Sequence, residues 1–66
     1  NIDINIITQK PKIQKYKKKI TNCIAKICNI SPLRINIKGK TTEKLGVIGK
    51  EKAIACEAIV SVIKYD

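Results

Sequence analysis

Apolar and polar residues alternate at the start of the chain. The apolar positions are Ile2, Ile4 and Ile6, and the polar positions between them are Asp3 and Asn5. A period of two residues is typical of a β-strand, and Ile7 adds an apolar residue on the polar side, which indicates cover on both faces. Residues 1–8 are therefore predicted to form a strand, which ends before Pro11 because proline lacks a backbone N–H.

A helical period replaces the alternation after Pro11. Proline suits the first turn of a helix, so a helix is predicted from about Lys12. Apolar residues spaced at helical intervals are predicted to form its buried face, and they are Ile13, Tyr16, Ile20, Cys23, Ile24 and Ile27. Asn29 is predicted to end the helix, because asparagine accepts the left-handed conformation beyond a helix end and Pro32 follows soon after.

Alternation returns in residues 33–38. Its apolar positions are Leu33, Ile35 and Ile37, and its polar positions are Arg34, Asn36 and Lys38. This pattern predicts a strand with one buried face. Residues 53–63 could begin as a helix, but their β-branched content favours a strand. Residues 41–52 are predicted to form a loop.

The predicted order is strand, helix, strand, loop, strand, which places the chain in the α+β class. The first two strands are predicted to be parallel, joined by a right-handed helical crossover. No repeat or linker divides residues 1–66, so one domain is expected. A domain of this length lies at the margin of independent stability, and its first residues already resemble the middle of a strand. We therefore expect a piece of a longer polypeptide.

Composition adds a strong positive charge, with a formal net charge of +9 and a pI near 9.8. Lysine, asparagine and isoleucine are abundant, which is typical of an AT-rich genome. The run Lys15, Lys17, Lys18 and Lys19 is expected to be the solvated face of the helix, not a nucleic-acid stripe. No apolar run is long enough to span a membrane.

The three cysteines are Cys23, Cys28 and Cys56. An odd number without a close-spaced ligand pair argues against both a disulfide scaffold and a zinc site. They are expected to be small buried residues in a reducing compartment.

Residues 41–46, Thr-Thr-Glu-Lys-Leu-Gly, offer the chemistry of a phosphate site. Two hydroxyls and backbone amides can donate to phosphate oxygens, and one carboxylate can bind a divalent cation. The same six residues also suit a Thr-capped turn between a strand and a short helical turn. The spacing alone leaves both interpretations open.

Three blocks resemble, in order and spacing, the C-terminal half of the 2-C-methyl-D-erythritol 2,4-cyclodiphosphate synthase family. They are residues 4–12, residues 35–38 leading into 41–46, and residues 54–58 (Ile-Ala-Cys-Glu-Ala). The resemblance implies a fragment of a mixed-sheet α/β sandwich subunit in a homotrimer with active sites between subunits. It also implies cyclisation of a cytidine diphosphate derivative with release of CMP, a step in isoprenoid precursor biosynthesis. The substrate's own 2-phosphate attacks the β-phosphorus, so no protein nucleophile is required.

The resemblance assigns site residues position by position. It matches a cytidine-binding loop to Thr8, Gln9, Lys10, Pro11, Lys12, Ile13 and Gln14. It matches the phosphate segment to Lys40, Thr41, Thr42 and Glu43, with further substrate positions at Val47 and Lys50. Thr41 is implied to steady the phosphates in the transition state, and Glu43 to bind magnesium or manganese. Family members usually carry Phe at Val47 and Arg at Lys50, and lysine keeps the charge but loses the planar fork.

The chain contains no histidine. The family's zinc site uses an Asp-x-His motif and a second histidine from the N-terminal half, so the zinc ligands are expected in a missing segment or another chain. These residues are therefore expected to be inactive alone and to supply the nucleotide pocket and trimer contacts. The resemblance implies a plastid-type organelle, apicoplast or chloroplast, for a eukaryotic source and the cytoplasm for a bacterial one.

Two alternatives are kept. Residues 46–49, Gly-Val-Ile-Gly, have the form of the G-x-x-G loop of a KH domain, and the charge would support a small basic RNA-binding module. A non-catalytic oligomerisation piece would differ from the first interpretation only in lacking nucleotide affinity.

Overall fold

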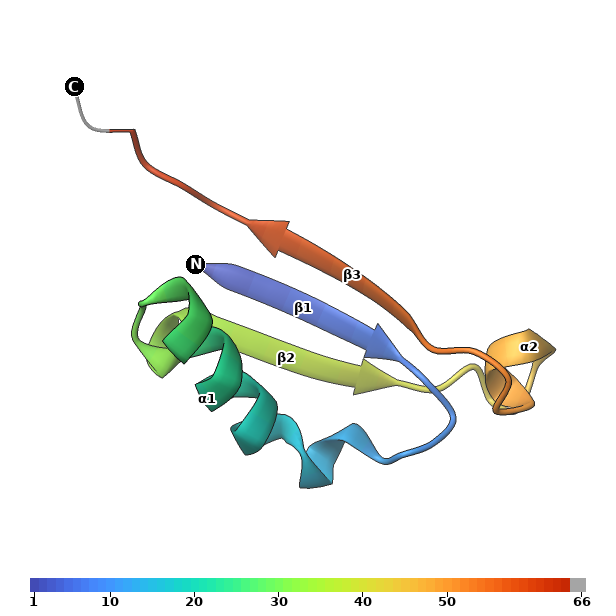
Figure 1. The fold of residues 1–66 in the computed structure, drawn as a ribbon. Coiled ribbons are helices and arrows are strands. Elements are labelled where there is room, and N and C mark those ends of the chain that lie inside the picture. Colours follow the sequence, from blue (N-terminus) through green and yellow to red (C-terminus); the bar gives the residue numbers. More distant parts are fainter. Residues whose placement is uncertain (65–66) are drawn as a thin grey trace.

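The computed structural model describes residues 1–64, which form a small sheet with one main helix on it (Figure 1). The elements in order are strand β1 (Ile2–Ile7), 3-10 helix η1 (Ile13–Lys15), helix α1 (Lys17–Cys28), 3-10 helix η2 (Pro32–Arg34), strand β2 (Ile35–Lys40), helix α2 (Gly46–Gly49) and strand β3 (Ala55–Val60). The α+β class and the order strand, helix, strand, loop, strand are confirmed. The loop contains one short helix.

The three strands form one mixed sheet in the order β2-β1-β3. β1 pairs in parallel with β2, with Ile4 opposite Ile37, which confirms the predicted parallel pair. β1 pairs antiparallel with β3, with Ile4 opposite Ala58. β1 is thus paired along both edges, but among residues 1–64 only one of its faces is covered by a helix, so the predicted cover on both faces is not seen there.

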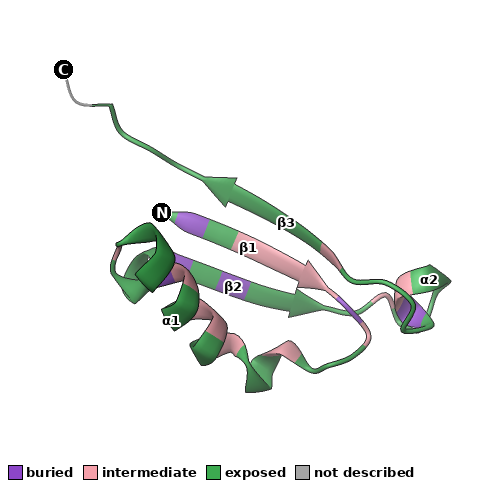
Figure 2. Ribbon diagram, in the orientation of Figure 1, coloured by how far each residue is buried: buried purple, intermediate pink, exposed green. Residues whose placement is uncertain are grey.

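The core lies between α1 and the sheet face that it covers (Figure 2). Its buried members are Ile2, Ala25, Ile35 and Ile37, and partly buried isoleucines pack around them. The opposite sheet face is polar: Asn36 Nδ2 donates to Asp3 Oδ1 over 3.3 Å, and Asn5 Nδ2 donates to Glu57 Oε1 over 3.2 Å.

The predicted helix is divided in two. The 3-10 helix η1 precedes α1, and Tyr16 stands between them as the N-cap of α1. This break sets the rotation of α1 so that Ile20, Ile24 and Ala25 contact the core. Tyr16, Cys23 and Ile27, which were predicted on the buried face, are exposed instead. The predicted end of the helix is confirmed, since Asn29 has the left-handed values φ 55° and ψ 47°.

The prediction that Leu33 lies on a buried strand face is wrong, because its side chain is 96% exposed. Ser31 Oγ accepts a hydrogen bond from the Leu33 N–H over 3.2 Å, and Pro32 begins η2. This capped turn delays the strand until Ile35. The predicted last strand, residues 53–63, is likewise shorter at both ends.

The prediction that the cysteines are buried is also wrong, since Cys23, Cys28 and Cys56 are all exposed. Lys15, Lys18 and Lys19 are exposed as predicted, whereas Lys17 is half-buried.

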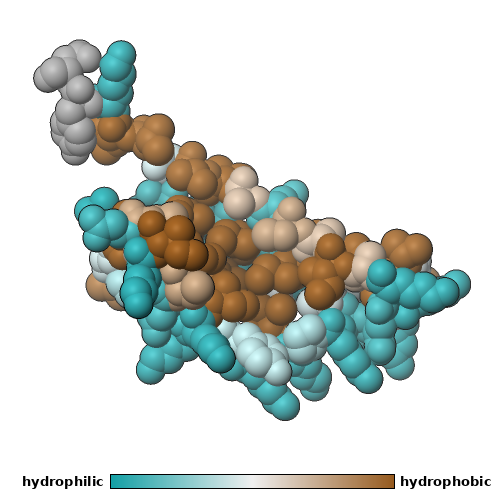
Figure 3. All heavy atoms as spheres, in the orientation of Figure 1, coloured by the Kyte–Doolittle hydropathy of each residue, from teal (hydrophilic) through white to brown (hydrophobic). Residues whose placement is uncertain are grey.

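The molecule exposes more surface than a compact monomer of its mass. Its accessible area is 5680 Å², whereas a folded 7.4 kDa chain is expected to expose about 4,200 Å². Figure 3 shows apolar side chains gathered over the sheet and along β3 and the segment after it. The large exposed apolar residues of β3 and of the segments beside it, here called the β3 apolar surface, are Ile54, Ile59, Val60, Val62 and Ile63. Ile59 and Val60 lie on opposite faces of the strand. Among residues 1–64, no helix is long and apolar enough to cross a membrane.

Candidate functional site

A cavity of about 350 Å³ opens where β1 and β2 end. Its lining residues are Thr8, Gln9, Pro11, Lys12, Ile13, Gln14, Lys17, Gly39, Lys40 and Thr41. Because the two strands are parallel, their carboxyl ends meet at one edge of the sheet, and the loops that leave them lie together. The Thr8 N–H donates to the Lys40 carbonyl over 2.9 Å and extends this pairing by one residue. We call the two segments the 8–14 loop and the 41–52 loop.

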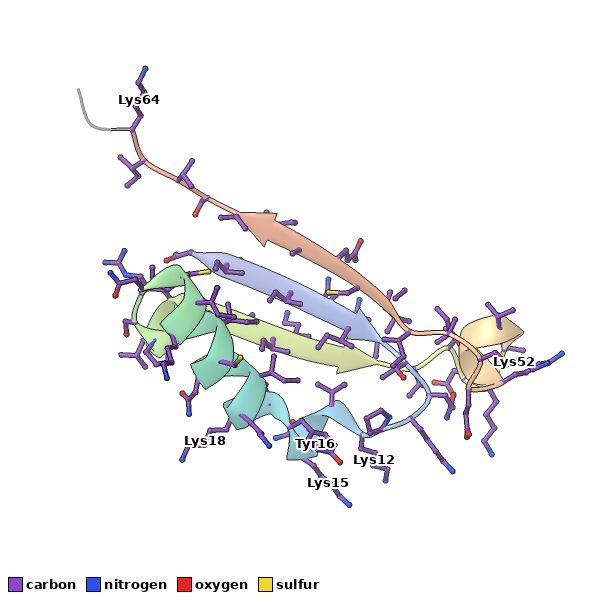
Figure 4. The ribbon with its side chains drawn as sticks, in the orientation of Figure 1. Lys12, Lys15, Tyr16, Lys18, Lys52 and Lys64 are labelled. Atoms are coloured by element: carbon purple, nitrogen blue, oxygen red, sulfur yellow. The ribbon has the colours of Figure 1, made fainter. Side chains whose placement is uncertain are left out.

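The cavity is basic. Lys12, Lys17 and Lys40 line it, and none of its lining residues is acidic. Figure 4 shows Lys12 on the segment between β1 and α1. Three lysines in the lining give the cavity a positive potential that attracts an anion, while Pro11 and Ile13 contribute apolar wall. The cavity therefore suits a ligand that has both anionic and apolar parts.

Ile13 and Gly39 form a close contact in the wall of this cavity. A Cβ added to Gly39 would lie 2.8 Å from the Ile13 Cβ, which is closer than van der Waals contact permits. Glycine at position 39 therefore lets η1 lie directly on the end of β2. This packing holds the 8–14 loop against the strand that leads to the 41–52 loop.

The first turn of the 41–52 loop uses its two threonine hydroxyls differently. Thr42 Oγ1 donates to the Leu45 carbonyl over 2.7 Å, so this hydroxyl proton is used within the loop. Thr41 Oγ1 accepts from the Glu43 N–H over 3.4 Å, which leaves its own proton to donate elsewhere. Thr41 lines the cavity, so its hydroxyl is the one placed to donate to a bound anion.

Left-handed residues shape the rest of this turn. Glu43, Lys44 and Gly46 have φ values of 56°, 65° and 69°. The buried Gly49 lies against the backbone of Lys44, because a Cβ on Gly49 would meet the Lys44 carbonyl carbon at 2.2 Å. The turn is thus folded tightly back on α2.

Two side-chain contacts join the loops. Gln9 Oε1 accepts a hydrogen bond from the Lys44 N–H over 3.1 Å. Lys10 Nζ lies 3.5 Å from Glu51 Oε1, and both side chains of this ion pair are largely exposed.

The structure brings most of the residues matched by resemblance into the cavity lining. Those outside the lining are Lys10, Thr42, Glu43, Val47 and Lys50. Val47 is 62% exposed on α2, and Lys50 caps the end of that helix. Sequence reasoning missed Lys17 and Gly39 as cavity residues. Lys17 was grouped with the solvated lysines, and only its place at the first turn of α1, beside η1, distinguishes it.

The donor set of residues 1–64 does not fit zinc, since no three Cys, Asp or Glu side chains gather into a metal-binding group and histidine is absent. The exposed Glu43 carboxylate fits one ligand of a magnesium ion, which typically takes one or two carboxylates together with substrate phosphates.

Comparisons with known proteins bear on this site. A family model described as the YgbB family matches residues 1–63. The chain is 88% identical over all 66 residues to a bifunctional enzyme IspD/IspF of Pelagibacter ubique, of which it covers 18%. It is 51% identical over 63 residues to the apicoplast 2-C-methyl-D-erythritol 2,4-cyclodiphosphate synthase of Plasmodium falciparum, of which it covers 26%. The chain thus spans about a fifth to a quarter of the length of these relatives.

The fold is similar to a solved structure of IspF from Plasmodium falciparum in a CDP complex. The match covers 88% of this chain and 37% of the solved chain, with a TM-score of 0.85 and 53% sequence identity. The RNA-binding alternative is not supported. Residues 46–49 form helix α2 itself rather than a loop between helices, and the chain then enters β3.

Proposed function

This chain belongs to the YgbB family, and we propose on that premise that it is the C-terminal part of a 2-C-methyl-D-erythritol 2,4-cyclodiphosphate synthase subunit. The whole enzyme, a phosphorus–oxygen lyase, converts 4-diphosphocytidyl-2-C-methyl-D-erythritol 2-phosphate into the cyclic diphosphate and releases CMP. One observation carries the proposal. The parallel β1–β2 pair brings the 8–14 loop and Thr41 together around a basic cavity.

Each part of the cavity has a role in this proposal. The 8–14 loop holds the cytidine, and the relative solved with CDP supports this class of ligand. Lys12, Lys17 and Lys40 offset the charge of the diphosphate. The Thr41 hydroxyl donates a hydrogen bond to a phosphate oxygen, on which negative charge develops during phosphoryl transfer. The contribution of this chain to catalysis is therefore to hold two anionic groups together within the whole enzyme, with no covalent step on the protein.

Metal ions complete the proposed site. Glu43 is the proposed ligand of magnesium or manganese, which would neutralise the charge between the α- and β-phosphates. Val47 and Lys50 are proposed to meet the substrate from the α2 side. The zinc ligands are proposed to come from the N-terminal part of the polypeptide, because residues 1–64 offer no cluster for them.

The surplus exposed surface supports a missing partner. It amounts to roughly 1,500 Å², more than one side of a standard protein interface, about 800 Å². We propose that residues 1–66 are one partial domain, and that the β3 apolar surface is covered by the N-terminal part within a homotrimer. Identity of 88% to a bacterial relative favours the cytoplasm as the compartment. A eukaryotic source would favour a plastid-type organelle, as in the name of the Plasmodium relative.

Turnover by the full-length protein tests the function. With zinc and magnesium, it should release CMP from the diphosphocytidyl substrate, and residues 1–66 alone should not. CDP should bind in preference to UDP, and this preference should survive moderate salt. Affinity for RNA that collapses with added salt, without discrimination between CDP and UDP, would contradict the proposal and return the RNA-binding alternative.

A further inference from the structure

The side chain of Gln9 is used by the protein itself. Its Oε1 accepts from the N–H of Lys44, a residue 35 positions away in the chain. Gln9 is half-buried and lines the cavity from the 8–14 loop, whereas Lys44 stands outside the lining. The bond therefore runs from the cavity wall to the turn behind it.

Lys44 is a residue that needs such support. Lys44 and Glu43 both adopt the left-handed conformation, with φ values of 65° and 56°. This conformation is unfavourable for residues that carry a Cβ, and two in succession persist only where surrounding contacts hold them. Gly49 packs against the Lys44 carbonyl carbon and Cα, and Gln9 accepts a hydrogen bond from the Lys44 N–H.

The second link between the loops is weaker. The ion pair of Lys10 with Glu51 has side chains 74% and 48% exposed, so solvent and salt screen it. The hydrogen bond from Lys44 to Gln9 is exposed as well, but Gln9 is half-buried and its partner is a backbone N–H, so this contact is directional and does not depend on charge.

We propose that Gln9 is a positioning residue that holds the 41–52 loop in register with the 8–14 loop. Its bond to Lys44 fixes the turn that carries Thr41 and Glu43, so that the Thr41 hydroxyl meets the β-phosphate of a nucleotide whose base lies in the 8–14 loop. This inference rests on the proposed function. It assigns the Gln9 side chain to the protein's own backbone and not to the base.

The test uses the full-length protein and the substitution Gln9→Met, which keeps the length of the side chain but replaces the strong acceptor with a thioether. Losing one hydrogen bond should lower kcat/KM by about 3- to 10-fold, through a higher KM as well as a lower kcat. Affinity for CDP should fall by a similar factor while affinity for CMP stays within about twofold, because only CDP carries the β-phosphate.

A matched pair at position 44 separates positioning from general loss of structure. Lys44→Asn and Lys44→Gln remove the same charge, but only asparagine tolerates the left-handed conformation well. In the Lys44→Asn background, Gln9→Met should lower kcat/KM by about twofold or less. In the Lys44→Gln background, it should lower kcat/KM as much as in the wild-type protein.

The outcomes are distinct. If the wild-type protein neither binds CDP nor releases CMP, the proposed function fails and this inference falls with it. If the wild-type protein is active and Gln9→Met leaves the CDP-to-CMP affinity ratio and kcat unchanged, the positioning role is overturned. Equal losses of CDP and CMP affinity would overturn it as well. So would an equal effect of Gln9→Met in the Lys44→Asn and Lys44→Gln backgrounds.

Discussion

Replacing Gly49 with alanine sets two physical effects against each other. Gly49 is the last residue of α2, and an alanine in a helix is favoured over glycine by up to about 1 kcal/mol. Against this, the new Cβ would lie 2.2, 2.7 and 2.8 Å from the carbonyl carbon, Cα and carbonyl oxygen of Lys44. These are backbone atoms, which cannot rotate away as a side chain can.

The distances show which effect wins. Carbon atoms in contact lie about 3.5–4.0 Å apart, so Lys44 must move by roughly 1.3 Å or α2 must unwind. Overpacking of this kind costs about 1–3 kcal/mol, which exceeds the gain in helix propensity. The same movement displaces the Lys44 N–H, which now lies 3.1 Å from Gln9 Oε1. A misplacement of about 1 Å near reacting groups can cost about 100-fold in rate.

We therefore expect Gly49→Ala in the full-length protein to lower the midpoint of thermal unfolding and to reduce CMP release by about 100-fold. Gly46→Ala is the matched control. Gly46 has φ 69° but no atom within 4 Å of an added Cβ, so only the left-handed penalty of about 1–2 kcal/mol applies. Stability and turnover are measured on both variants by calorimetry and CMP release. A Gly49→Ala protein as stable and active as wild type, as propensity alone predicts, would refute the reasoning.

Three further predictions follow from the site and the exposed surface. Thr41→Val should lower kcat by about 100-fold, because it removes a hydrogen-bond donor to the developing charge. Thr42→Val loses the bond to Leu45 and should mainly lower the unfolding free energy, by about 1 kcal/mol. Steady-state kinetics and denaturation measure the two effects, and the reverse assignment would contradict this prediction. Lys17→Gln should weaken CDP binding by about 3- to 5-fold at low ionic strength, as measured by calorimetric titration. Lys18→Gln is the control, because Lys18 lies outside the cavity, and it should leave CDP binding unchanged. Equal losses of affinity in the two variants would argue against a role for Lys17. Native mass spectrometry of the full-length protein should give masses that are multiples of three subunits with bound zinc, and a metal-free monomer would count against the trimer proposal.

The sequence was informative about elements whose signals are local. Alternation in β1 and the left-handed Asn29 at the end of α1 were both read correctly, and the helix between two strands predicted their parallel pairing. Leu33 was misread because a period of two residues does not distinguish a strand from a Ser-Pro capped turn. The buried stripe of the helix was read correctly at Ile13, Ile20 and Ile24, which pack against the core. It was misread at Tyr16, Cys23 and Ile27, because η1 and Tyr16 interrupt the single helix that the pattern predicted.

The site shows the same division. The resemblance assigned residues 8–14 and 40–43 together with Val47 and Lys50, and most of them lie together in the cavity lining. The exceptions are Lys10, Thr42, Glu43, Val47 and Lys50. Lys17 and Gly39 join them only through the packing of η1 on the end of β2. The hydrogen bond between Gln9 and Lys44 spans 35 residues, and no local pattern in the sequence encodes it.

A crystal structure of the full-length protein with CDP would test the proposed site. The cytosine should lie against the 8–14 loop and the β-phosphate within hydrogen-bonding distance of the Thr41 hydroxyl, with Gln9 still bonded to Lys44. A nucleotide outside this cavity, or a diphosphate turned away from Thr41, would contradict it.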